Sequence, residues 1–249
     1  MKRKTLTVFL ISALLVSGAA SAFVLLEPPR TWDTPPTYIV DDRGMASVTD
    51  GDGGVSATVT AIRSNQAWNG AGSGTVINAQ AGSVGAFQVG DGIPMLNFDD
   101  PLHVCNGNCL AATLTGFYED RADSSVRIFD ADIVTNTRFN FTSENEPDGC
   151  SSEIFVEGVM VHEAGHGLGL GHTDVAGATM YPSVSACNNS PATIEQDDAS
   201  GLNALYSGEG PDAGGGGSCA LLQTGESCSA NGECCSGKCR GKPGNQTCR

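Results

Sequence analysis

Short apolar runs separated by turn-forming residues mark the first expected strands of the chain. A run of apolar and β-branched residues bounded by Gly, Pro or Asp is typical of a β-strand. The first such run, Thr37–Val40, follows a proline-rich turn, and further runs lie between glycine-rich turns at Gly85–Val89 and Met95–Phe98. The pattern therefore predicts three strands before residue 100.

Three further segments, which lie between these strands or after them, carry apolar residues at helical spacing. Val55, Val59 and Ile62 recur at this spacing and predict an amphipathic helix that reaches Trp68. A second helix is expected over Ile154–Gly167, which has apolar positions on its faces.

The last expected helix opens at Thr193–Asp198. Thr193 is suited to cap it, and the acidic first turn suits the positive end of a helix dipole. Leu202, Leu205 and Tyr206 would form its inward face. Together these elements predict an α+β fold.

Residues 1–22 have the three parts of a secretory signal peptide. Residues 2–4 are basic, residues 6–16 are apolar, and residues 20–22 are small. The apolar character continues weakly to Leu26, so an uncleaved membrane anchor is the alternative. We expect the signal to be removed and the remaining chain to be secreted, with no attachment to the membrane.

The net charge of the chain limits the classes of partner that we expect it to bind. Its formal net charge is −15, and residues 23–218 contain six Arg, no Lys and 26 acidic residues, a charge of −20. Such an excess of acidic groups disfavours binding to nucleic acids or anionic membranes and favours solubility outside the cell. Residues 23–207 are long enough to form one domain with its own core, and we expect a monomer.

One stretch of the chain carries a pattern of metal ligands, H-E-A-G-H-G-L-G-L-G-H. On a helix, His162 and His166 project from the same face, and Glu163 can reach a water molecule beside a bound ion. Gly169 can adopt the positive φ that ends the helix, so that His172 supplies a third nitrogen. Three imidazoles and a water are the ligands of catalytic zinc. The alternative is a chance pattern of ordinary surface or core histidines.

This motif, followed by Ala178-Thr-Met-Tyr-Pro182, resembles the metzincin zinc endopeptidases and, among them, the matrixins. The resemblance implies a metzincin fold, with a twisted mixed sheet and an active-site helix. It implies that Met180 forms an apolar turn beneath the zinc, and that Tyr181 and Pro182 form a wall of the substrate pocket. Some metzincins have a tyrosine ligand at the position of Pro182, so that ligand is not supported here.

The same resemblance places the substrate on a strand at the edge of the sheet. Leu110, Ala111 and Ala112 resemble the edge strand that binds an extended protein or peptide substrate by main-chain hydrogen bonds, and Arg127–Val134 resembles its neighbour. The alternative is an ordinary buried strand pair. Ala112 stands where matrixins often have a histidine for a second zinc. Since His103 is the one histidine left outside the motif, we expect a single, catalytic zinc.

Ten cysteines divide into two groups. Cys105 and Cys109 would close a small loop before the edge strand, which leaves Cys150 and Cys187 to pair by elimination, although four cysteines allow three connectivities. A cysteine-based inhibitory propeptide, common in matrixins, is not expected, because little chain stands between residue 22 and the first strand.

The remaining six cysteines lie in residues 219–249, after the glycine-rich linker 208–218. Their order resembles the cystine-knot, or knottin, pattern, which implies the pairs Cys219–Cys235, Cys228–Cys239 and Cys234–Cys248. A zinc module is the alternative, but this segment has no histidine. The module could tether the enzyme to substrate or a surface. It could instead stabilise the C-terminus, as a clip, or block the active site as an inhibitory plug.

These observations predict a secreted zinc-dependent endopeptidase in which Glu163 is the general base. The alternative is a zinc-containing module that binds peptides without cleaving them. Several acidic clusters could bind calcium, although a solvated acidic surface explains each of them as well. The clusters are Asp50/Asp52, Asp99/Asp100, Glu119/Asp120/Asp123 and Asp130/Asp132.

Overall fold

The computed structural model describes residues 23–48, 55–71, 76–85, 87–143 and 149–206, together with the strands of a C-terminal hairpin. The chain divides into two compact units, residues 1–203 and 204–249. The expected signal peptide, the linker and most of the cysteine-rich module lie outside the described residues. Among those described, no helix combines the length and the apolar character needed to cross a membrane.

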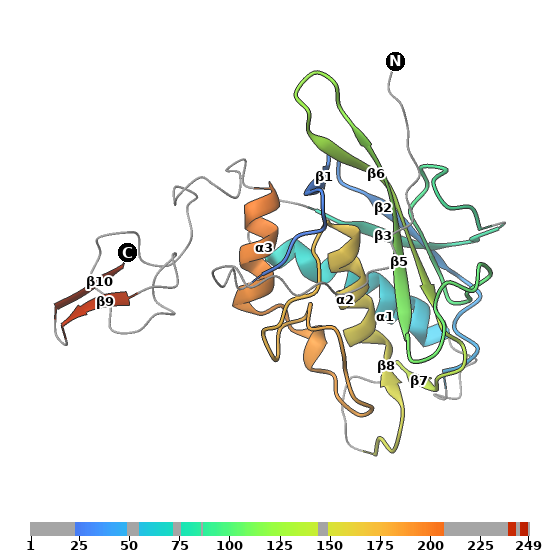
Figure 1. Ribbon diagram of the computed structural model, residues 1–249. Coiled ribbons are helices and arrows are strands. Elements are labelled where there is room, and N and C mark those ends of the chain that lie inside the picture. Colours follow the sequence, from blue (N-terminus) through green and yellow to red (C-terminus); the bar gives the residue numbers. More distant parts are fainter. Residues whose placement is uncertain are drawn as a thin grey trace. The chain divides into compact units, whose positions relative to one another are not determined.

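The first unit is built on a mixed sheet in which one strand runs antiparallel to the others (Figure 1). The parallel strands lie in the order β1, β6, β4, β2, β3, and β5 pairs antiparallel with β6 as an edge strand. The strands are β1 (Arg30–Trp32), β2 (Thr37–Asp41), β3 (Asn78–Gly82), β4 (Met95–Asn97), β5 (Ala111–Glu119) and β6 (Val126–Thr135). The predicted α+β fold with a mixed sheet is confirmed.

Two of the three strands predicted from apolar runs occur within one residue of their predicted bounds, namely β2 and β4. The strand predicted over Gly85–Val89 is wrong. Gly85 and Gly90 have positive φ values of 48° and 82°, so the chain turns there instead of extending. The strand lies earlier, at β3, whose side chains are largely exposed and which therefore needs no apolar run.

The helices α1 (Val55–Gln66) and α2 (Val156–Gly167) pack against each other on one face of the sheet (Figure 1). A short 3₁₀ turn, Ala67–Gly70, continues α1. Helix α2 begins two residues later than predicted, because Ile154–Phe155 forms a short parallel pair, β8, with β7 (Phe141–Thr142).

The buried face of α1 is not the face of Val59, one of the apolar residues from which the helix was predicted. Val59 is 57% exposed, whereas Ala57 and Ala61 are fully buried. Ser64 and Asn65 are also buried and direct their side chains to main-chain oxygens one turn earlier. Small side chains on this face let α1 approach its neighbours closely, which a row of valines would prevent.

The C-terminal helix of the domain, α3 (Gln196–Tyr206), begins three residues after the predicted cap at Thr193. Instead, Asp198 accepts a hydrogen bond from the Glu195 N–H at 2.9 Å, which satisfies a donor at the start of the helix. Thr193 follows a 3₁₀ turn, Ser190–Ala192.

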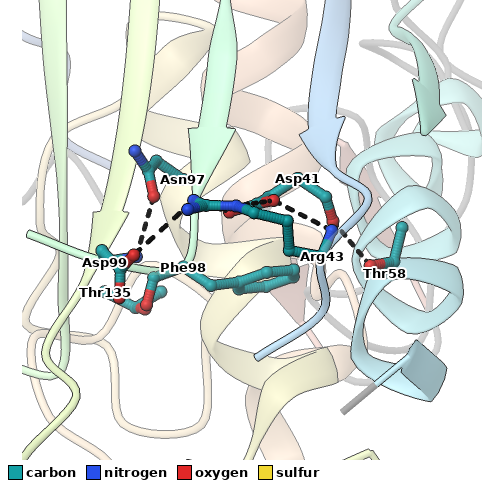
Figure 2. A network of polar contacts seen from close by, with 7 residues as sticks. All are labelled: Asp41, Arg43, Thr58, Asn97, Phe98, Asp99 and Thr135. Carbon is teal, nitrogen blue, oxygen red and sulfur yellow. Dashed lines mark hydrogen bonds and ion pairs between the residues drawn. The ribbon is translucent and has the colours of Figure 1, made fainter. Parts of the chain in front are cut away.

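Polar side chains join the carboxyl ends of the parallel strands (Figure 2). Arg43 forms an ion pair with the buried Asp41 after β2 and contacts Asp99 beyond β4 at 3.6 Å. Thr58 of α1 donates to Asp41 O at 2.7 Å, and Thr135 at the end of β6 donates to Phe98 O at 2.7 Å. These bonds fix three strands and α1 relative to one another at one end of the sheet.

In the second unit the structure describes a hairpin of β9 (Cys239–Lys242) and β10 (Asn245–Cys248). Each of the three cysteine pairs implied for this module includes at least one cysteine outside the described residues.

Candidate metal centre and active-site cleft

Helix α2 carries the first part of the site and is anchored by both tryptophans of the chain. The indole N–H of Trp68 donates to Val161 O, and that of Trp32 donates to Gly167 O, each at 2.8 Å. The second bond satisfies a carbonyl in the last turn of the helix, where carbonyls have no partner within the helix. The two bonds fix the helix on which His162, Glu163 and His166 lie.

The structure brings the three histidines of the motif together. The Nε2 atom of His172 lies 3.2 Å from that of His162 and 3.1 Å from that of His166. A tetrahedral zinc with bonds of about 2.0–2.1 Å separates its nitrogen ligands by roughly 3.3–3.4 Å. The three nitrogens therefore have the spacing of zinc ligands.

The opposite ring nitrogens of two histidines fix which nitrogen faces the metal. His162 Nδ1 lies 2.7 Å from Thr179 O, and His166 Nδ1 lies 2.8 Å from Leu170 O. A carbonyl can only accept, so each Nδ1 carries the proton and each Nε2 offers a lone pair. Burial lowers the pKa of His166 well below its usual value, and His162 and His172 lower it further. Burial and His162 together lower the pKa of His172 to about 4. Neutral imidazoles are the form that binds a metal.

His172 reaches the site because the chain reverses directly after α2. Gly169 has φ 104°, in the left-handed region that glycine adopts without strain. The N–H of Gly169 donates to His166 O and that of Leu170 donates to Gly165 O, which completes the helix end. The reversed segment is held from outside by the N-terminal residues, as Leu26 N donates to Gly169 O at 2.9 Å.

Met180 is 2% exposed, and its thioether lies against Gly165 of α2. Its main-chain turn is held by one carboxylate, since Asp198 accepts the N–H groups of Thr179 at 2.8 Å and Met180 at 3.0 Å. Gly165 of α2 leaves room for the thioether, because a Cβ there would meet the Met180 sulfur and lie 2.7 Å from Trp68. Sequence reasoning missed the role of Asp198, and the one available signal was the acidic start of the last helix.

Glu163 is 5% exposed, and its carboxylate is held from the edge strand. Thr113 Oγ1 of β5 lies 2.6 Å from Glu163 Oε2. Burial raises the pKa of Glu163, while His162 and the Thr113 hydrogen bond lower it in part. No sequence pattern marked Thr113 for this contact, because its partner lies 50 residues away.

The histidines and Glu163 lie in a cleft of about 900 Å³. The lining includes Leu110 and the first two residues of β5, Ala111 and Ala112. It also includes Tyr181 and Pro182, followed by Ser183, Val184 and Ala186 of the same loop. The residues predicted for the edge strand and the pocket wall thus line one cavity together with the three histidines.

Two disulfides flank the cleft. Cys105–Cys109 closes the small loop before β5, with Cα atoms 5.2 Å apart, and Cys150–Cys187 joins the approach to α2 to the loop that follows the pocket wall, with Cα atoms 5.6 Å apart. The Cys150 and Cys187 sulfurs also lie near Glu153, but they are bonded to each other and offer no thiolate to a metal.

Several acidic side chains considered as calcium ligands instead form ion pairs with, or accept hydrogen bonds from, groups of the protein. Asp99 contacts Arg43, and Asp100 accepts the N–H groups of Val104 and Cys105. Asp120 and Asp123 each cap a turn of their own loop. Asp50 and Asp52 lie outside the described residues. Among the residues that the structure does describe, no set of three acidic side chains gathers as metal ligands would, so calcium stays a prediction without assigned ligands.

Asp130 and Asp132 are fully buried on one face of β6. Asp130 accepts the Gly90 N–H at 2.6 Å, and Asp132 accepts the Met95 N–H at 3.1 Å. Burial raises the pKa of both carboxyls, and for Asp132 the neighbouring charge of Asp130 raises it further, to about 9. Such a pair retains a proton near neutral pH.

In comparison with known proteins, residues 86–207 match the model of a family described as matrixin. The chain is 44% identical over 65 residues to metalloendoproteinase 5-MMP of Arabidopsis thaliana, covering 26% of this chain and 18% of that protein. It is 37% identical over 59 residues to matrilysin of Rattus norvegicus, covering 24% and 22%. With neutrophil collagenase of Homo sapiens it shares 44% identity over 48 residues, covering 19% and 10%. The matches span about a fifth or less of the length of these relatives.

Proposed function

Residues 86–207 form a matrixin domain, and from this premise we propose that the chain is a secreted zinc endopeptidase that hydrolyses peptide bonds in proteins. The observation that carries the proposal is the convergence of three Nε2 atoms, 3.1 and 3.2 Å apart, beside a buried glutamate in an open cleft. The predicted signal peptide at residues 1–22 supports secretion.

In the proposed mechanism His162, His166 and His172 hold the zinc. When bound, the zinc acts as a Lewis acid and lowers the pKa of a water molecule in the cleft. Glu163 takes a proton from that water as general base and then gives the proton to the amine that leaves when the peptide bond breaks. Burial favours this role, because a raised pKa makes the carboxylate a better proton acceptor.

The substrate is proposed to bind as an extended strand along β5. Among the described strands, β5 pairs with β6 alone, so its other edge offers main-chain donors and acceptors to a peptide. The side chain after the cleaved bond would enter the part of the cleft beside Tyr181 and Pro182.

Glu163→Gln tests the mechanism. The amide keeps the shape of the side chain and replaces no proposed metal ligand, so we expect one zinc per chain by metal analysis, an unchanged melting temperature, and loss of nearly all peptide hydrolysis. Removing the metal with a chelator should abolish activity, and added zinc should restore it. Hydrolysis by the variant at the wild-type rate would contradict the mechanism. Peptide binding without any cleavage by the zinc-loaded wild type would instead identify a non-catalytic binding module.

The cysteine-rich module is proposed to raise the local concentration of substrate through its glycine-rich linker. Truncation after Ser207 tests this role. Tethering predicts unchanged cleavage of a short peptide and slower cleavage of a large or insoluble protein. Faster cleavage of both substrates would indicate a plug, and a lower melting temperature alone would indicate a clip.

A further inference from the structure

Thr113 is the residue of the edge strand that contacts the proposed general base. Its Oγ1 lies 2.6 Å from Glu163 Oε2 and 2.9 Å from the Glu163 main-chain oxygen. Within the described part of the chain, no other side chain is hydrogen-bonded to the Glu163 carboxylate. The neighbours Ala111 and Ala112 have no group that could replace this bond.

The position of Thr113 is itself fixed by the sheet. Thr113 pairs with Ile133 of β6, whose side chain is fully buried, and the register of β5 holds on both sides of this pair. The hydroxyl therefore approaches Glu163 from a rigid strand rather than from a loop. Since a threonine hydroxyl has one restricted rotatable bond, little freedom is lost when it forms the hydrogen bond.

A carboxylate that acts as a base must present one oxygen to the water whose proton it takes. The bond from Thr113 engages Oε2, so Oε1 is the oxygen left without this bond. The hydroxyl carries one proton and has two acceptors within reach, Oε2 and the main-chain oxygen. When Glu163 has accepted a proton, the hydroxyl can turn to the main-chain oxygen without any movement of heavy atoms.

We infer that Thr113 is a positioning residue for Glu163: its hydroxyl selects which carboxylate oxygen faces the reacting water and ties the general base to the strand proposed to bind substrate. This inference rests on the proposed function. It assigns a role in the reaction to a side chain outside the histidine motif.

Thr113→Val tests the inference, because valine keeps the shape of threonine and lacks the hydroxyl. With a short fluorogenic peptide that the wild type cleaves, kcat should fall about 10–100-fold, since misplacing a catalytic group by about 1 Å costs on the order of 10²-fold. KM and the zinc content should stay near wild type. Thr113→Ser, which restores the hydroxyl, should recover most of kcat.

Thr135→Val is the matched control. Thr135 ends the neighbouring strand β6, and its hydroxyl donates to Phe98 O at 2.7 Å rather than contacting Glu163. Loss of this hydroxyl should change kcat by less than about twofold. Equal losses in both valine variants would show a general effect on the sheet and overturn the inference.

Binding of two inhibitors gives a readout that does not depend on turnover. A peptide hydroxamate can share a proton with Glu163, whereas a peptide thiol binds a metal without needing a hydrogen bond from a carboxyl group. Calorimetric titration of zinc-loaded Thr113→Val should show about tenfold weaker binding of the hydroxamate and unchanged binding of the thiol, consistent with the loss of one positioned, charge-assisted hydrogen bond.

Unchanged kcat in Thr113→Val, or a loss that Thr113→Ser does not repair, would refute the positioning role. The proposed function fails separately: it fails if Glu163→Gln remains active. An inactive Glu163→Gln variant together with a fully active Thr113→Val variant would therefore overturn the inference about Thr113 alone.

Discussion

The two sides of the metal centre are held in place by different means. His162, Glu163 and His166 lie on the regular helix α2, which packs on α1 and the sheet. His172 and Met180 lie in residues 168–195, an irregular segment in which the longest helical element is the 3₁₀ turn Ser190–Ala192. On the helix, the main chain itself determines where the side chains point.

In the irregular segment, hydrogen bonds from individual polar side chains hold the main chain in place instead. Asp198 binds the N–H groups of Thr179, Met180 and Glu195. Asn189 accepts the Gly158 N–H and donates to Glu157, so it joins the segment to the first turn of α2. The main chain of a loop can be held as firmly as that of a helix when each of its N–H groups has a buried acceptor. Its geometry then depends on the few side chains that supply those acceptors.

The largest effect is expected from Asp198→Ala. This change leaves three main-chain donors in or near the core without an acceptor, which should lower the free energy of unfolding by about 3–5 kcal/mol. Because Thr179 O also binds His162, zinc affinity should fall together with stability. Thermal unfolding and a zinc competition titration measure both effects. Unchanged zinc affinity would mean that the turn keeps its geometry without Asp198.

The next largest effect is expected from replacing Cys150 and Cys187 by serine. The bond closes a loop with a sequence separation of 37 residues, and such a link typically stabilises a fold by about 2–4 kcal/mol. It also restrains the segment after the pocket wall, where Cys187 N donates to Glu153 O. The double variant should unfold at lower temperature and discriminate less between peptides that differ at the residue after the cleaved bond. The Cys105/Cys109 double variant, whose loop is far shorter, is the control and should lose less stability.

Gly165→Ala tests the contact between the two sides directly. Alanine favours a helix over glycine by about 1 kcal/mol, but here its Cβ would collide with Met180 and Trp68. Overpacking of this kind costs about 1–3 kcal/mol, so we expect a net loss of stability and of zinc affinity. The double variant Gly165→Ala with Met180→Ala should recover part of the stability. A more stable single variant would show that the contact is loose.

The last prediction concerns the sheet and depends on pH. The pKa of Asp132 is raised in the folded protein, to about 9, so the folded state holds a proton that the unfolded chain releases near pH 4. The stability that this proton contributes is fully present below about pH 4 and is lost as the pH rises toward 9. The negative charges of Asp130 and Asp91 help to raise the pKa of Asp132.

Asp132→Asn removes this titration and keeps an acceptor for the Met95 N–H. The melting temperature of the wild type should therefore fall relative to that of the variant between pH 5 and pH 8. The zinc site is the same in both proteins, so its pH dependence cancels in the difference. A difference that is constant over this range would contradict the raised pKa.

The predictions that succeeded rest on local patterns. The spacing of His162 and His166 requires only a helix, and Gly169 has the positive φ that its position after the helix suggested. Strands β2 and β4 were found from apolar runs because both are buried on the sheet. In each case the deciding interaction spans only a few residues of the chain.

The predictions that failed depended on distant neighbours. Gly85–Val89 is apolar but turns, while the polar β3 is a strand because β2 supplies its hydrogen-bond partners. Val59 faces solvent because the close approach of α1 to α2 selects small residues for the contact. Thr193 does not cap α3, because Asp198 satisfies the N–H of Glu195 instead.

The sequence alone identified the proposed metal ligands and the proposed general base, since a motif of eleven residues carries them at close range. The tertiary structure decided which groups hold that motif in place: Thr113 on Glu163, Asp198 on the turn of Met180, and Gly165 against the thioether. Their partners lie 50 residues away for Thr113 and 18 for Asp198. Contacts between residues so far apart in the chain leave no periodic pattern, because they depend on how whole elements pack.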